Sequence, residues 1–122
     1  MNKSYALVSA ILFGLVALLH LIRAFTGWEV LIGDYELPVV RSWVVFGVTI
    51  CLAAWGFRGS KGYAVVSAVL FGLVALLHLY RVLISQTVVI IDTLTVPMTA
   101  SWIGFIVSAG LCVWGFLSYR SS

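Results

Sequence analysis

A stretch of fifteen residues occurs twice in nearly identical form, and it restricts the possible folds of this chain more than any other feature. Residues 9–23 read SAILFGLVALLHLIR, and residues 67–81 read SAVLFGLVALLHLYR. Each copy belongs to an apolar run long enough, at about 1.5 Å per residue, to cross a hydrocarbon layer of about 30 Å. The sequence therefore predicts a tandem duplication whose units each contain a membrane-spanning helix.

The composition is typical of a chain surrounded mostly by lipid. Hydrophobic residues make up 63% of the sequence and charged residues only 9%, which is outside the range of soluble domains. Apolar runs of spanning length lie at about 5–25, 38–57, 63–84 and 97–117. These runs predict an all-α membrane protein with four transmembrane helices, divided into a first unit at 1–59 and a second unit at 60–122.

The segments between the two helices of each unit are rich in β-branched and alternating residues. Residues 28–37, which contain a Gly-Asp turn signal, and residues 87–96 each predict a short β-hairpin. A lone two-stranded hairpin is marginal in water, so the two hairpins are expected to lie side by side as one small sheet. The offset between the units is 58 at His20 and His78 but 59 at Pro38 and Pro97. The change predicts one extra residue in the second hairpin.

The positions of the charges predict how the chain is oriented. An even number of spans places both termini and the central connection on one side, which then carries Lys3, Arg58, Lys61 and Arg120. The other side receives three arginines and four acidic residues. By the positive-inside rule, the first side is the cytoplasm. We therefore expect a multi-pass protein of a cell inner (plasma) membrane, with both termini cytoplasmic and the hairpins extracytoplasmic.

Each repeated helix carries one histidine followed three residues later by an arginine. A helical wheel places His20 on the face of the first helix that carries the small residues, with Arg23 on its flank, and His78 and Arg81 repeat this pattern. Small residues mark the side where another helix approaches closely in lipid. The histidines are therefore expected to point inward, toward an axis shared by both units. Ionisable groups are costly within a membrane span, so those that occur there are candidates for a function. These four residues are therefore the candidate cofactor-binding residues.

Several functions are compatible with these four residues. Two imidazoles from two helices could ligate a b-type haem, with an arginine beside each propionate. The same groups could bind a quinone or a lipid headgroup. The histidine pair could also relay protons or ions in a small transporter or channel that acts as an oligomer.

A structural role for the same four residues is the favoured hypothesis. In it, each histidine tethers the hairpin backbone, and the arginines pair with Glu29, Asp34, Glu36 or Asp92. The protein would then be a structural or accessory subunit that packs in the bilayer against a membrane protein partner or further copies of itself.

Other kinds of chemistry have little support in the sequence. Paired carboxylates, a phosphate-binding loop and a cysteine-rich metal motif do not occur, so neither enzymatic activity nor a metal site is expected. The positive charges are isolated rather than arranged in a stripe, which argues against a nucleic-acid partner. Four serines in the spans are expected to form hydrogen bonds between helices rather than to act as nucleophiles: Ser9, Ser42, Ser67 and Ser101.

The predicted orientation can be tested by chemical labelling in sealed vesicles. A reagent that does not cross the membrane should reach Lys61 from the side of the termini and Trp28 from the opposite side, because one span, at 38–57, separates these positions. Labelling of both residues from a common side would contradict the four-span arrangement.

Overall fold

The computed structural model describes residues 2–121, which contain four long helices and a small sheet. The helices are α1 (Lys3–Thr26), α2 (Val40–Arg58), α3 (Lys61–Tyr80) and α4 (Met98–Arg120). A π-helical turn, η1 (Arg81–Ser85), continues α3. All four helices are long and apolar enough to cross a membrane, as the sequence predicts. The helices α2 and α4 begin just after Pro38 and Pro97, because a proline fixes the backbone that enters a helix.

The four strands form one antiparallel sheet in the order β2-β1-β3-β4. The first hairpin consists of β1 (Val30–Ile32) and β2 (Tyr35–Glu36), and the second of β3 (Val89–Ile91) and β4 (Leu94–Val96). The central pairing joins the two hairpins, with Leu31 opposite Ile90. The expected side-by-side arrangement of the hairpins is thus confirmed.

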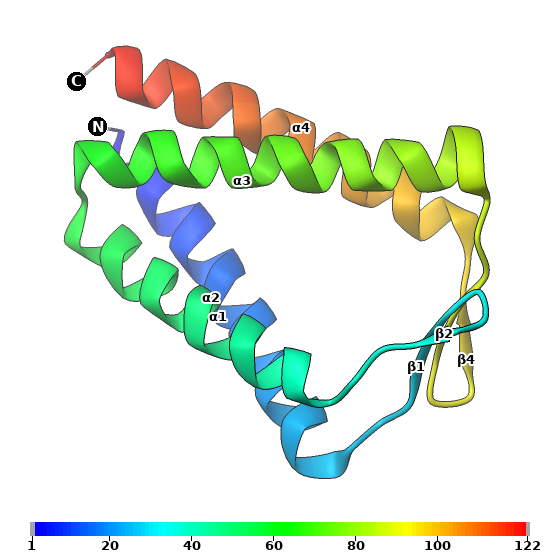
Figure 1. The fold of residues 1–122 in the computed structure, drawn as a ribbon. Helices are drawn as coiled ribbons and strands as arrows, with labels where there is room; N and C mark the ends of the chain where they lie inside the picture. Colours follow the sequence, from blue (N-terminus) through cyan, green and yellow to red (C-terminus); the bar gives the residue numbers. More distant parts are fainter. Residues whose placement is uncertain (1, 122) are drawn as a thin grey trace.

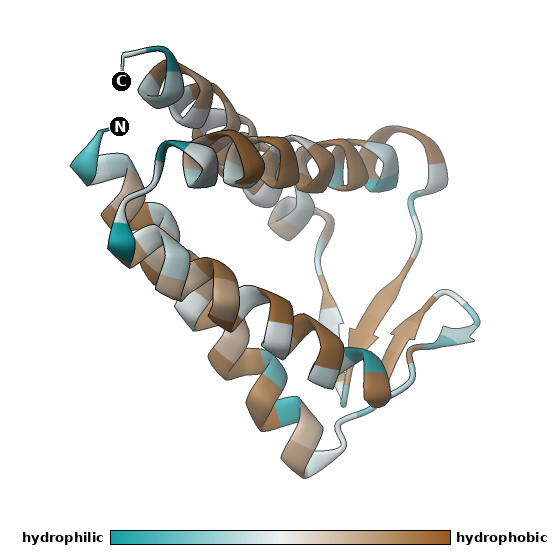
Figure 2. Cartoon of the chain, turned by 60° about the vertical axis from the view of Figure 1, so that its left-hand side comes forward, coloured by the Kyte–Doolittle hydropathy of each residue, from teal (hydrophilic) through white to brown (hydrophobic). Residues whose placement is uncertain are grey.

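The helices form two helical hairpins that meet at one end and diverge toward the other. Helix α1 packs along α2, and α3 packs along α4. The two pairs come together where the chain termini lie, and the sheet spans the open end between them (Figure 1). Apolar residues cover most of each helix, whereas polar residues gather near the helix ends and at the turns of the sheet (Figure 2).

Reciprocal hydrogen bonds join the two helical hairpins where they meet. The Tyr5 hydroxyl lies 2.5 Å from Ser67 Oγ, and the Tyr63 hydroxyl lies 2.6 Å from Ser9 Oγ. Each serine donates its own hydrogen to the carbonyl four residues earlier, so the tyrosine is the donor in both pairs. All four side chains are fully buried, and their polar groups are satisfied as burial requires.

Aromatic rings and glycines complete this junction. The rings of Phe13 and Phe71 stack with centroids 5.1 Å apart and planes inclined by 16°. The Tyr63 ring lies so close to Gly56 of α2 that a Cβ atom there would be 2.7 Å from it, and Tyr5 lies in the same way against Gly115 of α4. Each tyrosine therefore packs on the backbone of the other helical hairpin. The small residues of α1 and α3 lie at this interface, as the wheel predicts.

The position of the extra residue differs from the sequence prediction. Strands β1 and β3 begin at Val30 and Val89, which are 59 residues apart. The offset between the units has therefore already changed before β3 begins. The prediction that the extra residue lies within the second hairpin was wrong. The change falls between Arg81 and β3, a segment that contains the π-helical turn η1. A π-helical turn accommodates more residues than an α-helical turn, so it can absorb one residue without moving the strand.

The close approach at Gly56 predicts a large effect for a small substitution. Gly56→Ala should lower the free energy of unfolding by about 1–3 kcal/mol, because the new methyl group would displace the Tyr63 ring. Gly47→Ala, on the same helix, is the matched control, since a Cβ atom there meets nothing within 4 Å. Equilibrium unfolding in mixed detergent micelles measures both variants. Equal stability of the two would contradict the packing described here.

Candidate functional site

The side chain of Arg23 holds the first β-hairpin to the helices. Arg23 lies in the last turn of α1 and is only 5% exposed. Its Nε donates to the carbonyl of Trp28 at 2.9 Å, and its Nη2 donates to the carbonyl of Leu37 at 2.6 Å. Its Nη1 donates to Ser42 Oγ at 3.0 Å and to the carbonyl of Pro38 at 3.4 Å. One guanidinium thus joins α1, both ends of the hairpin and the first turn of α2.

Arg81 makes the corresponding contacts in the second half of the chain. Its Nε donates to the carbonyl of Thr87 at 3.0 Å and its Nη2 to the carbonyl of Val96 at 2.9 Å. Its Nη1 donates to Ser101 Oγ at 2.7 Å. The second guanidinium therefore links the π-helical turn, the second hairpin and α4.

The arginines provide hydrogen-bond donors to the backbone carbonyls that flank each β-hairpin. A carbonyl without a hydrogen-bond donor beside an apolar layer costs several kcal/mol, by order of magnitude. The planar guanidinium presents five N–H groups in fixed directions, so it can serve carbonyls on separate segments at once. The expected pairing with Glu29, Asp34, Glu36 or Asp92 was wrong in this respect: the hydrogen bonds of both arginines go to carbonyl and hydroxyl oxygens.

The ring of His20 lies between α2 and a cavity under the sheet. Its Nδ1 is 3.3 Å from Ser42 Oγ, the same oxygen that accepts from Arg23. The cavity has a volume of about 270 Å³, and both His20 and Arg23 line it. The predicted hydrogen bond from the histidine to the hairpin backbone is replaced by this contact with Ser42, and the arginine is the residue that tethers the hairpin.

The ring of His78 has different surroundings. It packs against Gly104 of α4 so closely that a Cβ atom there would lie 2.7 Å from both Cε1 and Nε2. Each histidine therefore contacts the second helix of its own helical hairpin, and the hairpins diverge in this part of the fold (Figure 1). A haem held by both rings would require them to face one iron atom. Ligation by this pair stays a prediction, which an absorption spectrum of the purified protein tests.

The serines singled out in the sequence link helices, as expected. Ser42 joins α1 to α2, Ser101 joins η1 to α4, and Ser9 and Ser67 join α1 to α3. The carbonyl acceptors of the arginines could not be identified from residue types. Their one signal in the sequence is the similar spacing from each arginine to the serine after the proline, at Arg23 and Ser42 and at Arg81 and Ser101.

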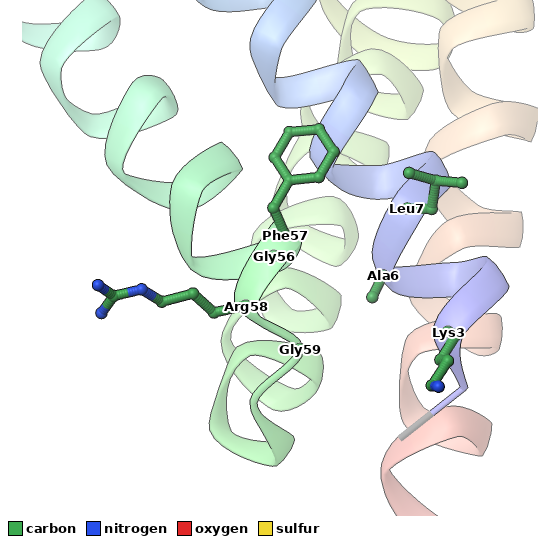
Figure 3. A pocket seen from close by; sticks show the side chains of 7 residues that line it. All are labelled: Lys3, Ala6, Leu7, Gly56, Phe57, Arg58 and Gly59. Atoms are coloured by element: carbon green, nitrogen blue, oxygen red, sulfur yellow. The ribbon is translucent and has the colours of Figure 1, made fainter.

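A second cavity, which the sequence did not indicate, lies at the opposite end of the first helical hairpin. Its volume is about 400 Å³, and it is bounded by the first turns of α1 and the end of α2 (Figure 3). Lys3 and Arg58 line this cavity. The Arg58 side chain points away from α1 (Figure 3). Its remaining walls are small or apolar, with Ala6, Leu7 and Phe57 among them.

Comparison with known proteins adds no family to this description. No protein-family model, no curated protein and no solved structure matches the chain.

Removing one guanidinium should loosen the fold strongly. Arg23→Gln is expected to lower the free energy of unfolding by about 2–5 kcal/mol, because it removes a buried guanidinium and leaves partly buried carbonyls at both ends of the hairpin without this donor. Arg23→Lys should restore little of the loss, since an ammonium cannot reach acceptors in several directions. Thermal unfolding in detergent measures the change. The control is Arg58→Gln, at an exposed residue, and a loss there as large as in Arg23→Gln would contradict the proposed role.

Proposed function

We propose that this protein is a small integral membrane protein that acts as a structural or accessory subunit, holding a four-stranded sheet at one membrane surface and packing against other membrane proteins. The observation that carries the proposal is the use of Arg23 and Arg81. Both guanidinium groups donate hydrogen bonds to carbonyls at the ends of the β-hairpins and to serines of α2 or α4. Their chemistry therefore serves the position of the sheet.

The exposed surface of the helices supports a role in packing. In the most apolar stretch of each helix, between 22% and 33% of the residues are buried inside the chain. Large apolar side chains such as Leu77, Ile84 and Ile106 are more than 60% exposed. Four helices arranged as two diverging pairs leave broad faces for lipid and for further helices, which associate in membranes by close packing.

The charge distribution and the repeated stretch support a finer placement. We infer that the chain arose by duplication of a unit with two spans and one hairpin. In this proposal both termini are cytoplasmic in an inner or plasma membrane, and the sheet lies on the outer side. The support is the number of basic residues at the termini and at the α2–α3 connection.

Cross-linking from a native cysteine tests the proposed association. Cys51 is exposed on α2, so a photoactivatable reagent attached to it in membranes should capture a neighbouring chain. We expect the protein to be extracted by a mild detergent in an assembly larger than its 13.3 kDa monomer, with the adduct lost in Cys51→Ser. A monomer in several mild detergents, together with no adduct in membranes, would contradict the accessory role.

A further inference from the structure

The cavity beside His20 has apolar walls and one polar edge. Its apolar walls come from α1, the first hairpin and one residue of the second hairpin: Leu19, Trp28, Val30, Leu37 and Ile91. Val30 and Ile91 are opposite each other in the central strand pairing, so the cavity is complete only when the two hairpins form one sheet. The remaining lining groups are His20 and Arg23.

A chain of hydrogen bonds determines what His20 can offer to this cavity. Arg23 donates to Ser42 Oγ, which leaves the Ser42 hydroxyl hydrogen to be donated. His20 Nδ1 lies 3.3 Å from the same oxygen, so the Ser42 hydroxyl can donate to it when the ring is in the Nε2–H tautomer. An imidazole that accepts at Nδ1 carries its hydrogen at Nε2. In that tautomer the ring has an N–H donor at Nε2 for a molecule in the cavity.

Arg23 supplies positive charge to the cavity rather than further hydrogen bonds. Four of its hydrogen bonds go to the carbonyls of Trp28, Leu37 and Pro38 and to Ser42. All of these acceptors are neutral, so its charge is not compensated by them. A fixed cation with neutral partners at an apolar wall attracts an anion, because the attraction is strong where little water screens it.

The second half of the chain does not offer the same donor. Three residues after Ser42 stands Val45, whereas three residues after Ser101 stands Gly104. The missing side chain at Gly104 lets the His78 ring lie against α4, with its Nε2 at the backbone. Val45 occupies the corresponding position of α2. The His20 ring lines the cavity under the sheet.

We propose that this cavity binds the headgroup of an anionic lipid, with a phosphate or carboxylate oxygen accepting a hydrogen bond from His20 Nε2. The volume of about 270 Å³ is just below the range of about 300–1,000 Å³ that is typical of small-molecule sites, which suits a headgroup but not a whole lipid. Leu19 is 59% exposed, so the hydrocarbon chain can leave the cavity past this residue. The proposal depends on the membrane placement only for the source of the ligand.

Native mass spectrometry of the full chain in a nonionic detergent tests this site. Dioleoyl phosphatidylglycerol should bind about tenfold or more tightly than dioleoyl phosphatidylcholine, and His20→Ala should remove this preference, because it removes a charge-assisted hydrogen bond. His78→Ala is the matched control and should leave the preference unchanged. Oleate that binds with the same dependence on His20 would support the site with a carboxylate as the source, whereas binding of phosphatidylglycerol alone supports a phosphate.

A second variant keeps the test decisive if His20→Ala does not fold. Leu19→Trp narrows the cavity at an exposed position and retains the donor, and it should weaken phosphatidylglycerol binding about tenfold. Equal binding of the two phospholipids by the wild type would overturn the proposal, as would equal losses in His20→Ala and His78→Ala. These readouts count bound lipids per chain, so they are independent of whether the protein associates with other chains.

Discussion

The structure depends on the solvation of backbone carbonyls where the chain leaves its helices. Each helical hairpin is interrupted by a short β-hairpin, and the carbonyls at both ends of that hairpin need donors beside an apolar layer. Arg23 in the last turn of α1 and Arg81 at the start of η1 provide them, with hydrogen bonds of 2.6–3.0 Å to the carbonyls of Trp28, Thr87, Leu37 and Val96. Because both arginines place their hairpins in the same way, β1 and β3 can pair.

The two ends of the molecule are held together by different means. At the end with the termini, Tyr5 and Tyr63 pack on glycines of the opposite helical hairpin and donate to serines. At the other end, the sheet joins the two halves through the pairing of β1 with β3 (Figure 1). The halves also differ in detail, since Gly104 admits the His78 ring against α4. The cavity beside His20 is lined by α1 and by residues of both β-hairpins.

The sequence predicts the helices, the hairpins and their pairing, because hydrophobic length and β-branched alternation are local signals. It also places Ser42 and Ser101 at helix contacts. It misassigns the partners of Arg23 and Arg81, since acidic residues are visible in a sequence but backbone carbonyls are not. The position of the extra residue, between Arg81 and β3, depends on the geometry of the π-helical turn, which the strand pattern does not reveal. The His78 ring lies against Gly104 of α4, unlike the His20 ring, which lies beside a cavity. The sequence does not reveal this difference, because it does not give the distance between α3 and α4.

Solid-state NMR of the protein in bilayers tests the central role of the arginines most directly. A measurement of the dipolar coupling between Arg23 ¹⁵Nε and the ¹³C-labelled carbonyl of Trp28 reports the contact whose nitrogen and oxygen are 2.9 Å apart. The account predicts a strong coupling there and a matching one between Arg81 and Thr87. Absence of both couplings, with the guanidinium nitrogens coupled instead to carboxylate carbons, would contradict it.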